Sequence, residues 1–369
     1  KANMSYTKVW PTEKIKALTL ATIFATLSLA IALNSPEIKD GDSLNEHNKM
    51  ESYESNWGSN SIQGEALLNS GGFQQGSIYT SSTVVMGANH ACSILIDGLV
   101  RCWGYNQNGQ LGDGTQTSRL TPVKPTMPEN MVSLAAAGET TCALSDDGDV
   151  YCWGSNTYGQ LGDGTTTKSL TPVKAQFSSG ALSIAMGFDH TCAILENGSV
   201  ECTGRGTYGV LGHGTNTDTS TPVAVNSLPS SAIGLAAGRF HTCALLDDGD
   251  IYCWGSNDEG QLGDLTTTNS NSPVRTTLTG NNDPYSSISV GEDFTCGLVH
   301  TGSVYCWGDN SQGQLGDGTT TDQPSGKVEA SIPGTALSLS SATHHTCAVL
   351  SDGSLHCWGL NDYGMIGDG

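Results

Sequence analysis

The twelve cysteines of this chain fall into six pairs, and the two members of every pair stand ten residues apart. The pairs are Cys92 with Cys102, Cys142 with Cys152, Cys192 with Cys202, Cys243 with Cys253, Cys296 with Cys306, and Cys347 with Cys357. The first cysteines of successive pairs are 50 to 53 residues apart, and a glycine follows each of them by six residues. Periods of this size are typical of stacked supersecondary units, none of which can bury its apolar face alone. The cysteine spacing therefore predicts a repeat architecture.

The second repeat shows what one unit contains. Its first half alternates apolar and polar residues, is rich in β-branched and aromatic types, and is interrupted by turn residues, as in a β-hairpin. If Cys142 opposes Cys152, then Ser145 opposes Asp149, and a three-residue loop that ends at Gly148 joins the two strands. Glycine is favoured at that place because a type I turn followed by a bulge needs a left-handed residue.

The alternation of hydrogen-bonded and non-hydrogen-bonded pairs in this hairpin predicts disulfides. Counting outward from a hydrogen-bonded pair at 145/149 makes 142/152 a non-hydrogen-bonded pair, with Cα atoms about 4.5 Å apart. A disulfide accepts separations of about 4.4 to 6.8 Å. Structural zinc is the alternative, but it needs four ligands in short clusters, whereas each repeat offers two thiols ten residues apart. We therefore predict six disulfides, each within one hairpin, and neither a metal nor a cofactor.

Histidine stands two residues before a cysteine in four repeats, at His90, His190, His241 and His345. In the other two repeats Thr140 and Phe294 take the same position. A position that accepts threonine and phenylalanine is better explained by side-chain packing at the edge of a repeat than by metal binding.

Residues 1–33 have the features of an export segment. Lysines precede an apolar run from Ala17 to Leu33, and Ala30-Ile31-Ala32 offers a small-x-small cleavage motif. A run of seventeen residues is also just long enough for an uncleaved membrane anchor. Because the positive charges precede the run, both readings export the remainder of the chain. We expect a secreted or cell-surface protein that touches a membrane only through this segment.

Residues 34–80 are rich in Ser, Asn, Gly and Glu and show no sustained period, which predicts a polar linker. Within this segment Trp57-Gly58 matches the Trp-Gly of the repeat, but without a cysteine pair.

The formal net charge of the chain is −21. Such a surface repels phosphate backbones, because sequence-independent affinity for nucleic acids comes from clustered Lys and Arg. We expect no nucleic-acid partner, and we predict a monomer.

The consensus H-x-C-A-L-x-x-x-G-x-V-x-C-W-G-x-N-x-x-G-Q-L-G-D-G-T, followed by T-P-V, recurs six times over residues 81–369. It resembles the repeat of the regulator of chromosome condensation (RCC1) family, whose members are typically seven-bladed β-propellers. Paired cysteines in these strands are similar to those of secreted bacterial and archaeal members. The resemblance implies an all-β propeller with six blades, or seven if the chain is truncated, since it stops at Gly369 inside a repeat.

The repeated polar residues have structural explanations. The segment GQLGDGT could be mistaken for a phosphate loop, but it lacks the Gly-Lys-Ser/Thr ending and a following helix. Aspartates of this segment are expected to satisfy turn amides; they are Asp113, Asp163, Asp264, Asp317 and Asp368. A catalytic constellation would stand outside the repeated positions, and the sequence nominates none. We expect no enzyme.

Two functions fit this chain. The first is an exported, non-catalytic binding scaffold for a protein or a glycan. The alternative, which the family resemblance implies, is a guanine-nucleotide exchange factor for a small GTPase.

The third repeat departs most from the consensus, with Thr203, Gly206, Val210 and His213 in place of Trp, Asn, Gln and Asp. Loops that differ between blades are where a specific partner can bind. The candidate binding residues are Arg205, Tyr208, His213, Arg239 and Phe240.

Overall fold

The computed structural model describes residues 60–62, 81–95, 98–128, 130–277 and 283–367. Three predicted features lie outside these ranges: the export segment 1–33, the Trp57-Gly58 match to the repeat, and most of the linker 34–80. Within them the chain is built from β-strands, together with one short 3-10 turn, η1 (Thr207–Gly209).

The strands form six antiparallel sheets in chain order, and each sheet is one blade of a propeller. Blade one holds β1 (Asn60–Ile62), β2 (Ser81–Met86), β3 (His90–Leu95), β4 (Val100–Gly104) and β5 (Arg119–Val123). Blade two holds β6 (Met131–Ala137), β7 (Thr140–Ser145), β8 (Val150–Gly154) and β9 (Ser169–Lys174). Blade three holds β10 (Ala181–Met186), β11 (His190–Leu195), β12 (Val200–Gly204) and β13 (Thr219–Ala224). Blade four holds β14 (Ala232–Ala237), β15 (His241–Leu246), β16 (Ile251–Gly255) and β17 (Ser270–Arg275). Blade five holds β18 (Tyr285–Val290), β19 (Phe294–Val299), β20 (Val304–Gly308) and β21 (Gln323–Glu329), and blade six holds β22 (Ala336–Ser341), β23 (His345–Leu350) and β24 (Leu355–Gly359).

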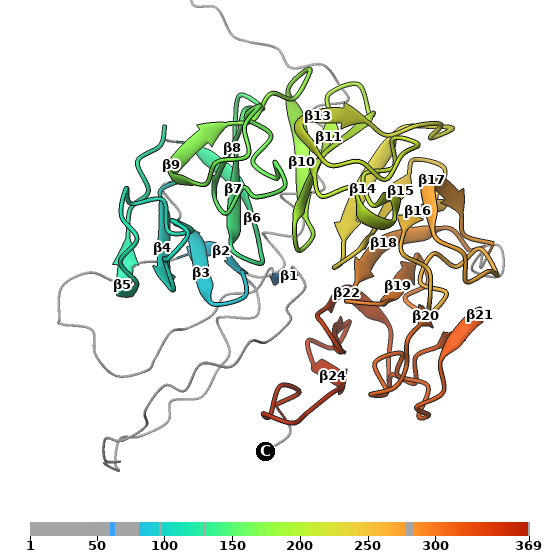
Figure 1. Cartoon of the computed structure of the whole chain (residues 1–369). Coiled ribbons are helices and arrows are strands. Elements are labelled where there is room, and N and C mark those ends of the chain that lie inside the picture. The colour runs from blue at the N-terminus through green and yellow to red at the C-terminus, as the bar shows by residue number, and fades with distance from the viewer. Residues whose placement is uncertain (1–59, 63–80, 96–97, 129, 278–282, 368–369) are drawn as a thin grey trace, which may run out of the picture.

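The blades stand side by side around a central axis (Figure 1). The strands nearest the axis are β2, β6, β10, β14, β18 and β22, and each contacts the next one in this series. Apolar cores fill the spaces between neighbouring blades, and each core combines side chains from two of them. The protein is therefore an all-β, six-bladed propeller, as the repeat pattern predicts.

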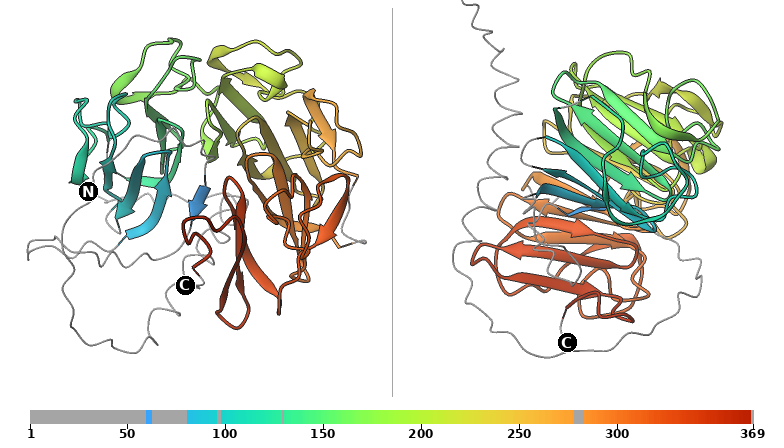
Figure 2. Two further views of the ribbon diagram at one scale, coloured as in Figure 1. Left: turned by 60° about the horizontal axis from the view of Figure 1, so that its bottom comes forward. Right: turned by 90° about the vertical axis from the view of Figure 1, so that its left-hand side faces the viewer.

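Strand β1 lies within the predicted linker, yet it belongs to the propeller. It pairs antiparallel with β2, with Ser61 opposite Val85, and it also contacts β22 of blade six. Figure 2 shows it between these two blades. This strand could not be predicted from the sequence, because Asn60-Ser61-Ile62 is too short and too polar to show the alternation of apolar and polar residues typical of a strand. At least these three residues are not linker.

The predicted hairpin register is confirmed. In blade two, Cys142 faces Cys152, and the backbone N–H of Ser145 donates to the carbonyl of Asp149 at 2.9 Å. Gly148 has a φ of +86°, which is the left-handed conformation expected of it.

All twelve cysteines are engaged in disulfides, and each bridge lies within one hairpin as predicted. The Cα atoms of the bridged residues are 4.0 to 4.1 Å apart, slightly closer than the 4.5 Å that we expected from an ideal ladder. The bridges join Cys92 to Cys102, Cys142 to Cys152, Cys192 to Cys202, Cys243 to Cys253, Cys296 to Cys306, and Cys347 to Cys357.

One backbone carbonyl in each of the first five blades joins it to the next blade. The carbonyl of Gln110 in blade one accepts hydrogen bonds from Thr141 Oγ1 at 3.0 Å and from Trp153 Nε1 at 2.8 Å, both in blade two. The same donors recur in blades four, five and six. In blade three, where the tryptophan is absent, the Thr203 hydroxyl donates to the Gly159 carbonyl at 2.9 Å instead. The repeated tryptophan and threonine are thus structural.

The repeated histidine is also structural, as predicted, but it does not lie at an edge. His90, His190 and His241 are buried between blades, and in each case Nε2 is hydrogen-bonded to a threonine hydroxyl of the next blade, at 2.7 to 3.0 Å. These threonines donate in turn to the carbonyls described above. Each buried imidazole therefore extends the polar connection between neighbouring blades.

The repeated aspartates accept turn amides, as predicted. The carboxylates of Asp113, Asp163, Asp264 and Asp317 each accept the backbone N–H of the threonine two residues later, at 2.9 to 3.0 Å. Asp368 lies outside the described residues. The repeated asparagine organises the same loop: Asn106 accepts the N–H of Leu111 and donates to Asp113 and to the Thr115 carbonyl.

Leu265 is strained, and replacing it by glycine is expected to stabilise the protein. Its φ is +68°, at a position where the other loops carry Gly114, Gly164, Gly214 and Gly318. A left-handed conformation costs a leucine about 1–2 kcal/mol, which exceeds the entropy cost of glycine, about 0.5–1 kcal/mol. Leu265 is 51% exposed, so little apolar contact is lost. We expect Leu265→Gly to raise the free energy of unfolding by about 0.5–1 kcal/mol, measured by thermal melting. Gly164→Leu is the matched reverse change, and a higher melting temperature for that variant would contradict the explanation.

Candidate binding face

Two sets of loops form one face of the propeller. One set is the turns that join the two inner strands of each blade, such as β10–β11 and β14–β15. The other set is the loops that follow the third strand of each blade. Hydrogen bonds join the two sets: the backbone N–H of Arg205 donates to the carbonyl of Asp189 at 2.9 Å, and that of Ser256 to the carbonyl of Phe240 at 2.8 Å. We call this surface the turn face. The residue three positions before the first cysteine lies on it in every blade and varies in charge and size: Asn89, Glu139, Asp189, Phe240, Asp293 and His344.

Phe240 is the centre of a group of arginine and aromatic side chains on this face. The guanidinium carbon of Arg205 lies 5.3 Å from the centroid of the Phe240 ring and 4.9 Å from that of Tyr158. Tyr208 meets Phe240 edge-on, with centroids 5.4 Å apart and an interplanar angle of 65°. Both geometries are attractive, because ring faces carry partial negative charge and ring edges carry partial positive charge.

Arg239 completes the group. Its guanidinium carbon lies 4.9 Å from the centroid of Phe240 and 5.7 Å from that of Phe188, and it forms an ion pair with Glu292 of blade five. Contacts between blades two, three, four and five therefore hold these side chains in place. We call the following six residues the arginine–aromatic cluster: Tyr158, Phe188, Arg205, Tyr208, Arg239 and Phe240.

The backbone beneath Tyr208 is strained. Its φ of 63° and ψ of 1° are left-handed values, and the side chain is 38% exposed. A non-glycine residue in this region costs about 1–3 kcal/mol, and such costs persist mostly at binding and catalytic sites. Tyr208 thus combines backbone strain with an exposed ring beside Phe240.

Val210 and Phe240 are both departures from the repeat. The position of Val210 holds a buried glutamine in blades one, two, four and five. Nε2 of Gln110 and of Gln160 has no hydrogen-bond partner among the described residues. In blade four, by contrast, the amide reaches the turn of the next blade, since Gln261 Nε2 donates to Asp293 Oδ1 at 3.0 Å. Val210 removes that donor from beneath the turn of blade four. Phe240 occupies the position that corresponds to Asp293. Blade three thus carries Val210 where those four blades carry glutamine, and the turn of blade four carries Phe240 where that of blade five carries Asp293.

The structure brings together four of the five candidate residues: Arg205, Tyr208, Arg239 and Phe240. His213 does not join them. Its Nε2 is hydrogen-bonded to Thr215 Oγ1 at 2.7 Å and lies 3.3 Å from Thr217 Oγ1, both within its own loop, and burial lowers its pKa. Tyr158 and Phe188 were missed, because Tyr158 stands in the most regular repeat and Phe188 follows no recognisable motif.

Next to the cluster, blades four and five carry an excess of carboxylates. Burial, followed by the charges of Glu292 and Asp309, raises the pKa of Asp293 to about 6. Burial and nearby aspartates also raise the pKa of Glu259. His344 of blade six lies between two carboxylates, with Nε2 3.7 Å from Glu292 and Nδ1 4.0 Å from Asp309. The described residues include no group of three or more His, Cys, Asp or Glu side chains arranged to hold a metal ion.

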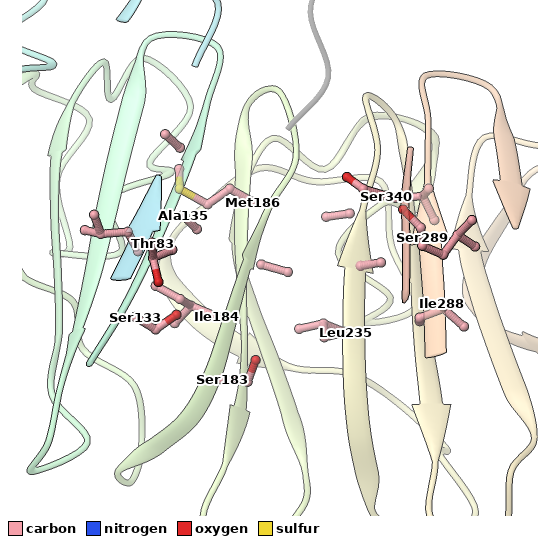
Figure 3. Close-up of a pocket in the computed structure, with 17 residues that line it drawn as sticks. Thr83, Ser133, Ala135, Ser183, Ile184, Met186, Leu235, Ile288, Ser289 and Ser340 are labelled. Atoms are coloured by element: carbon pink, nitrogen blue, oxygen red, sulfur yellow. The ribbon is translucent and has the colours of Figure 1, made fainter. Parts of the chain in front are cut away.

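A cavity of about 230 Å³ lies on the central axis, between the inner strands (Figure 3). Small and aliphatic side chains line it, including Ser133, Ser183, Ile184, Met186 and Ser289. All its lining residues are uncharged and lack a titratable side chain. The cavity therefore offers neither a general base nor a charged group for a substrate.

Comparison with known proteins shows where the chain belongs. The family model for the RCC1-like domain matches residues 57–369. The ultraviolet-B receptor UVR8 of Arabidopsis thaliana is 37% identical over 137 residues, which are 37% of this chain and 31% of the receptor. The secretion-regulating guanine nucleotide exchange factor of Bos taurus is 31% identical over 157 residues, which are 38% of this chain and 34% of that protein. The chain thus aligns with about a third of the length of each relative.

Solved structures agree with this assignment. Yeast RCC1 (Prp20), in its complex with Kap60, superposes with a TM-score of 0.69 at 24% identity, covering 79% of this chain and 72% of that one. Human WBSCR16 superposes with a TM-score of 0.65 at 22% identity, covering 72% of this chain and 70% of that one. At such identities the likeness concerns the fold. Together with the family model, it establishes that the chain is a member of the RCC1-like domain family.

Proposed function

We propose that this protein is an exported, non-catalytic binding scaffold and that its turn face binds a protein or glycan partner. The arginine–aromatic cluster is the observation that carries the proposal. Aromatic residues and arginine are the types enriched among interface hot spots. Here they are held by contacts from four blades, at a place where neighbouring repeats differ most. Such a pre-positioned group loses little conformational entropy when a partner binds.

The six disulfides support export. Disulfides form and persist in oxidising compartments and are rare in the cytosol, and here they engage every cysteine of the chain. Whether residues 1–33 are cleaved or retained as an anchor remains a prediction from the sequence.

The described residues contain no helix that combines the length and the apolar character needed to cross a bilayer.

The chemistry of the site favours binding over catalysis. The arginine–aromatic cluster holds no serine, cysteine or lysine nucleophile, and its two cations are engaged with rings and carboxylates. The net charge of −21 continues to argue against a nucleic-acid partner. A monomeric state also remains a prediction.

One relative supports the alternative function, regulation of nucleotide exchange on a small GTPase. It is the secretion-regulating guanine nucleotide exchange factor, which matches 38% of this chain. Acceleration of labelled-nucleotide release from a panel of small GTPases by the purified protein would favour this alternative. Export to a disulfide-forming compartment speaks against it, because small GTPases act in the cytosol.

Alanine substitutions in the cluster test the proposed binding role. The immobilised propeller is used to capture a partner from native extracellular material, and the affinity of that partner is then measured for variants. We expect Phe240→Ala and Arg205→Ala to weaken binding by at least fivefold, because Phe240 contacts three cluster members and Arg205 lies between two rings.

Tyr105→Ala provides the control for this series. Tyr105 is an exposed aromatic residue of blade one that takes the position of Arg205 in its repeat. Equal weakening by Tyr105→Ala, or full affinity in Phe240→Ala, would move the binding site elsewhere on the propeller.

A further inference from the structure

The positive charges of the arginine–aromatic cluster are compensated within the chain. Arg205 Nη1 lies 3.3 Å from Asp189 Oδ2, and Arg239 forms its ion pair with Glu292, whose side chain is buried. The guanidiniums are also flanked by rings. What the cluster offers to a partner is therefore mainly apolar ring surface, above all that of Tyr208 and Phe240.

The neighbouring carboxylates are not compensated to the same degree. Asp293 takes the position of Phe240 in the turn of the next blade. Glu259 of blade four takes the position that Tyr208 has in blade three. Asp309 of blade five takes the position that Arg205 has in blade three. The cation that acts on Asp293 is Arg239, which is already paired with Glu292, and the imidazole of His344 lies near Glu292 and Asp309.

The interactions of these carboxylates show that they repel one another. Burial raises the pKa of Asp293 most, the charges of Glu292, Asp309 and Glu259 raise it further, and Arg239 opposes them. Neutral amides provide the close hydrogen bonds: Gln261 donates to Asp293 at 3.0 Å, and Gln314 donates to Asp309 at 2.6 Å. A cation that arrives from outside would relieve this repulsion.

We propose, as a refinement that rests on the binding role above, that the turn face receives a basic segment of a protein partner. An apolar side chain of that segment packs on Tyr208 and Phe240, while a neighbouring lysine or arginine sits among Glu259, Asp293 and Asp309. This pairing places an apolar contact directly beside a charged one. The segment is thereby recognised by the two properties together, and neither property alone suffices.

Charge complementarity separates this partner from other occupants. An acidic peptide or a phosphate-bearing ligand would add negative charge to the three carboxylates. A neutral glycan could stack on the rings but would leave the carboxylates uncompensated. A second copy of the chain would bring the same acidic turns against themselves.

Three synthetic heptapeptides with blocked ends test the proposal at about 0.15 M salt, where distant charges are screened. The first, GRLKLRG, combines basic and apolar residues; the second, GELELEG, reverses the charge; the third, GRSKSRG, keeps the charge and removes the apolar groups. Binding is measured by NMR titration, which detects weak affinities. We expect the first peptide to bind at least tenfold more tightly than the other two.

Matched variants locate the site of the first peptide. Asp293→Asn is expected to weaken its binding at least fivefold, and Phe240→Ala to a similar extent. Glu139→Gln, at the corresponding position of blade two, removes the same net charge and is expected to have little effect. Because the pKa of Asp293 is about 6, binding to the unmodified protein should weaken by about threefold or more between pH 7.5 and 5. That pH dependence should be much smaller in Asp293→Asn.

Several results would overturn the proposal. Equal binding of GRLKLRG and GRSKSRG would indicate general attraction to an acidic protein, and so would equal losses in Asp293→Asn and Glu139→Gln. Tighter binding of GELELEG, or no binding of GRLKLRG at millimolar concentration, would exclude a basic segment. If the captured partner loses affinity with Phe240→Ala but keeps it with Asp293→Asn, the binding face stands and only the basic partner is excluded.

Discussion

Reduction of all six disulfides is expected to unfold the propeller at about 37 °C. Each bridge joins residues separated by ten positions, and closing a loop of this size stabilises a protein by about 3 kcal/mol in the chain-entropy estimate. The contributions are not simply additive. Six of them nevertheless exceed the total stability of a typical domain, about 5–15 kcal/mol. Circular dichroism of the reduced and alkylated protein, compared with the oxidised protein, gives the measurement.

The bridges are also expected to differ in how easily they are reduced. The cysteines of the first five blades are completely buried, whereas Cys347 and Cys357 of blade six are partly exposed. Mild reductant followed by mass mapping should therefore open the bridge between Cys347 and Cys357 first. A double substitution, Cys142→Ala with Cys152→Ala, removes one buried bridge and should cost about 2–3 kcal/mol.

Two findings would contradict these expectations. Peptide mapping without reductant could reveal links between different repeats, which the hairpin register does not allow. Alternatively, the fully reduced protein could melt at nearly the temperature of the oxidised protein, in which case the interfaces between blades would supply most of the stability.

The sequence allowed prediction of what recurs within one repeat. A turn such as Asp146-Asp147-Gly148, the register of the cysteines and the aspartates that accept turn amides all depend on residues close together in the chain. Such local geometry follows from spacing and from the requirements of glycine, aspartate and cystine. Six copies of the pattern also supplied six independent checks of each assignment.

Contacts between different blades could not be predicted in the same way. Arg205 touches Tyr158 and Phe240, which stand 47 residues before it and 35 residues after it. Departures from the repeat pointed to Arg205 and Phe240 but not to Tyr158, which is an ordinary residue of a regular loop. The same departures suggested His213, whose loop holds it away from the cluster. A deviation from consensus therefore identifies the right blade more securely than the right side chain.

Acid is expected to destabilise the propeller through its buried histidines. Burial lowers the pKa of His90 and of His241 to about 4, and burial together with the charge of His241 lowers that of His190 to about 3. An unfolded chain binds a proton on each of these imidazoles below about pH 6.5. The folded state resists protonation, so the stability present above pH 6.5 is lost as the pH falls toward 4. At about pH 4.5 each histidine should cost about 2–3 kcal/mol relative to neutral pH.

Blade five shows how to test this prediction without disturbing the fold. Phe294 takes the histidine position there, and its ring lies against the backbone of Gly291 just as the ring of His190 lies against Gly187. Phenylalanine thus fits the same space but cannot bind a proton. We expect His190→Phe to be about 2–3 kcal/mol more resistant to urea than the unmodified protein at about pH 4.5, after correction for the difference between the two at pH 7.5.

The control is His300→Phe, at an exposed position on the hairpin of blade five. This substitution removes one imidazole from the surface and should leave the dependence of stability on pH unchanged. If His190→Phe lost stability between pH 7.5 and 4.5 as steeply as the unmodified protein, the buried imidazole would have to be accepting its proton in the folded state. The interface between blades three and four would then contain a counter-charge or a path for water that the hydrogen bond to Thr242 does not indicate.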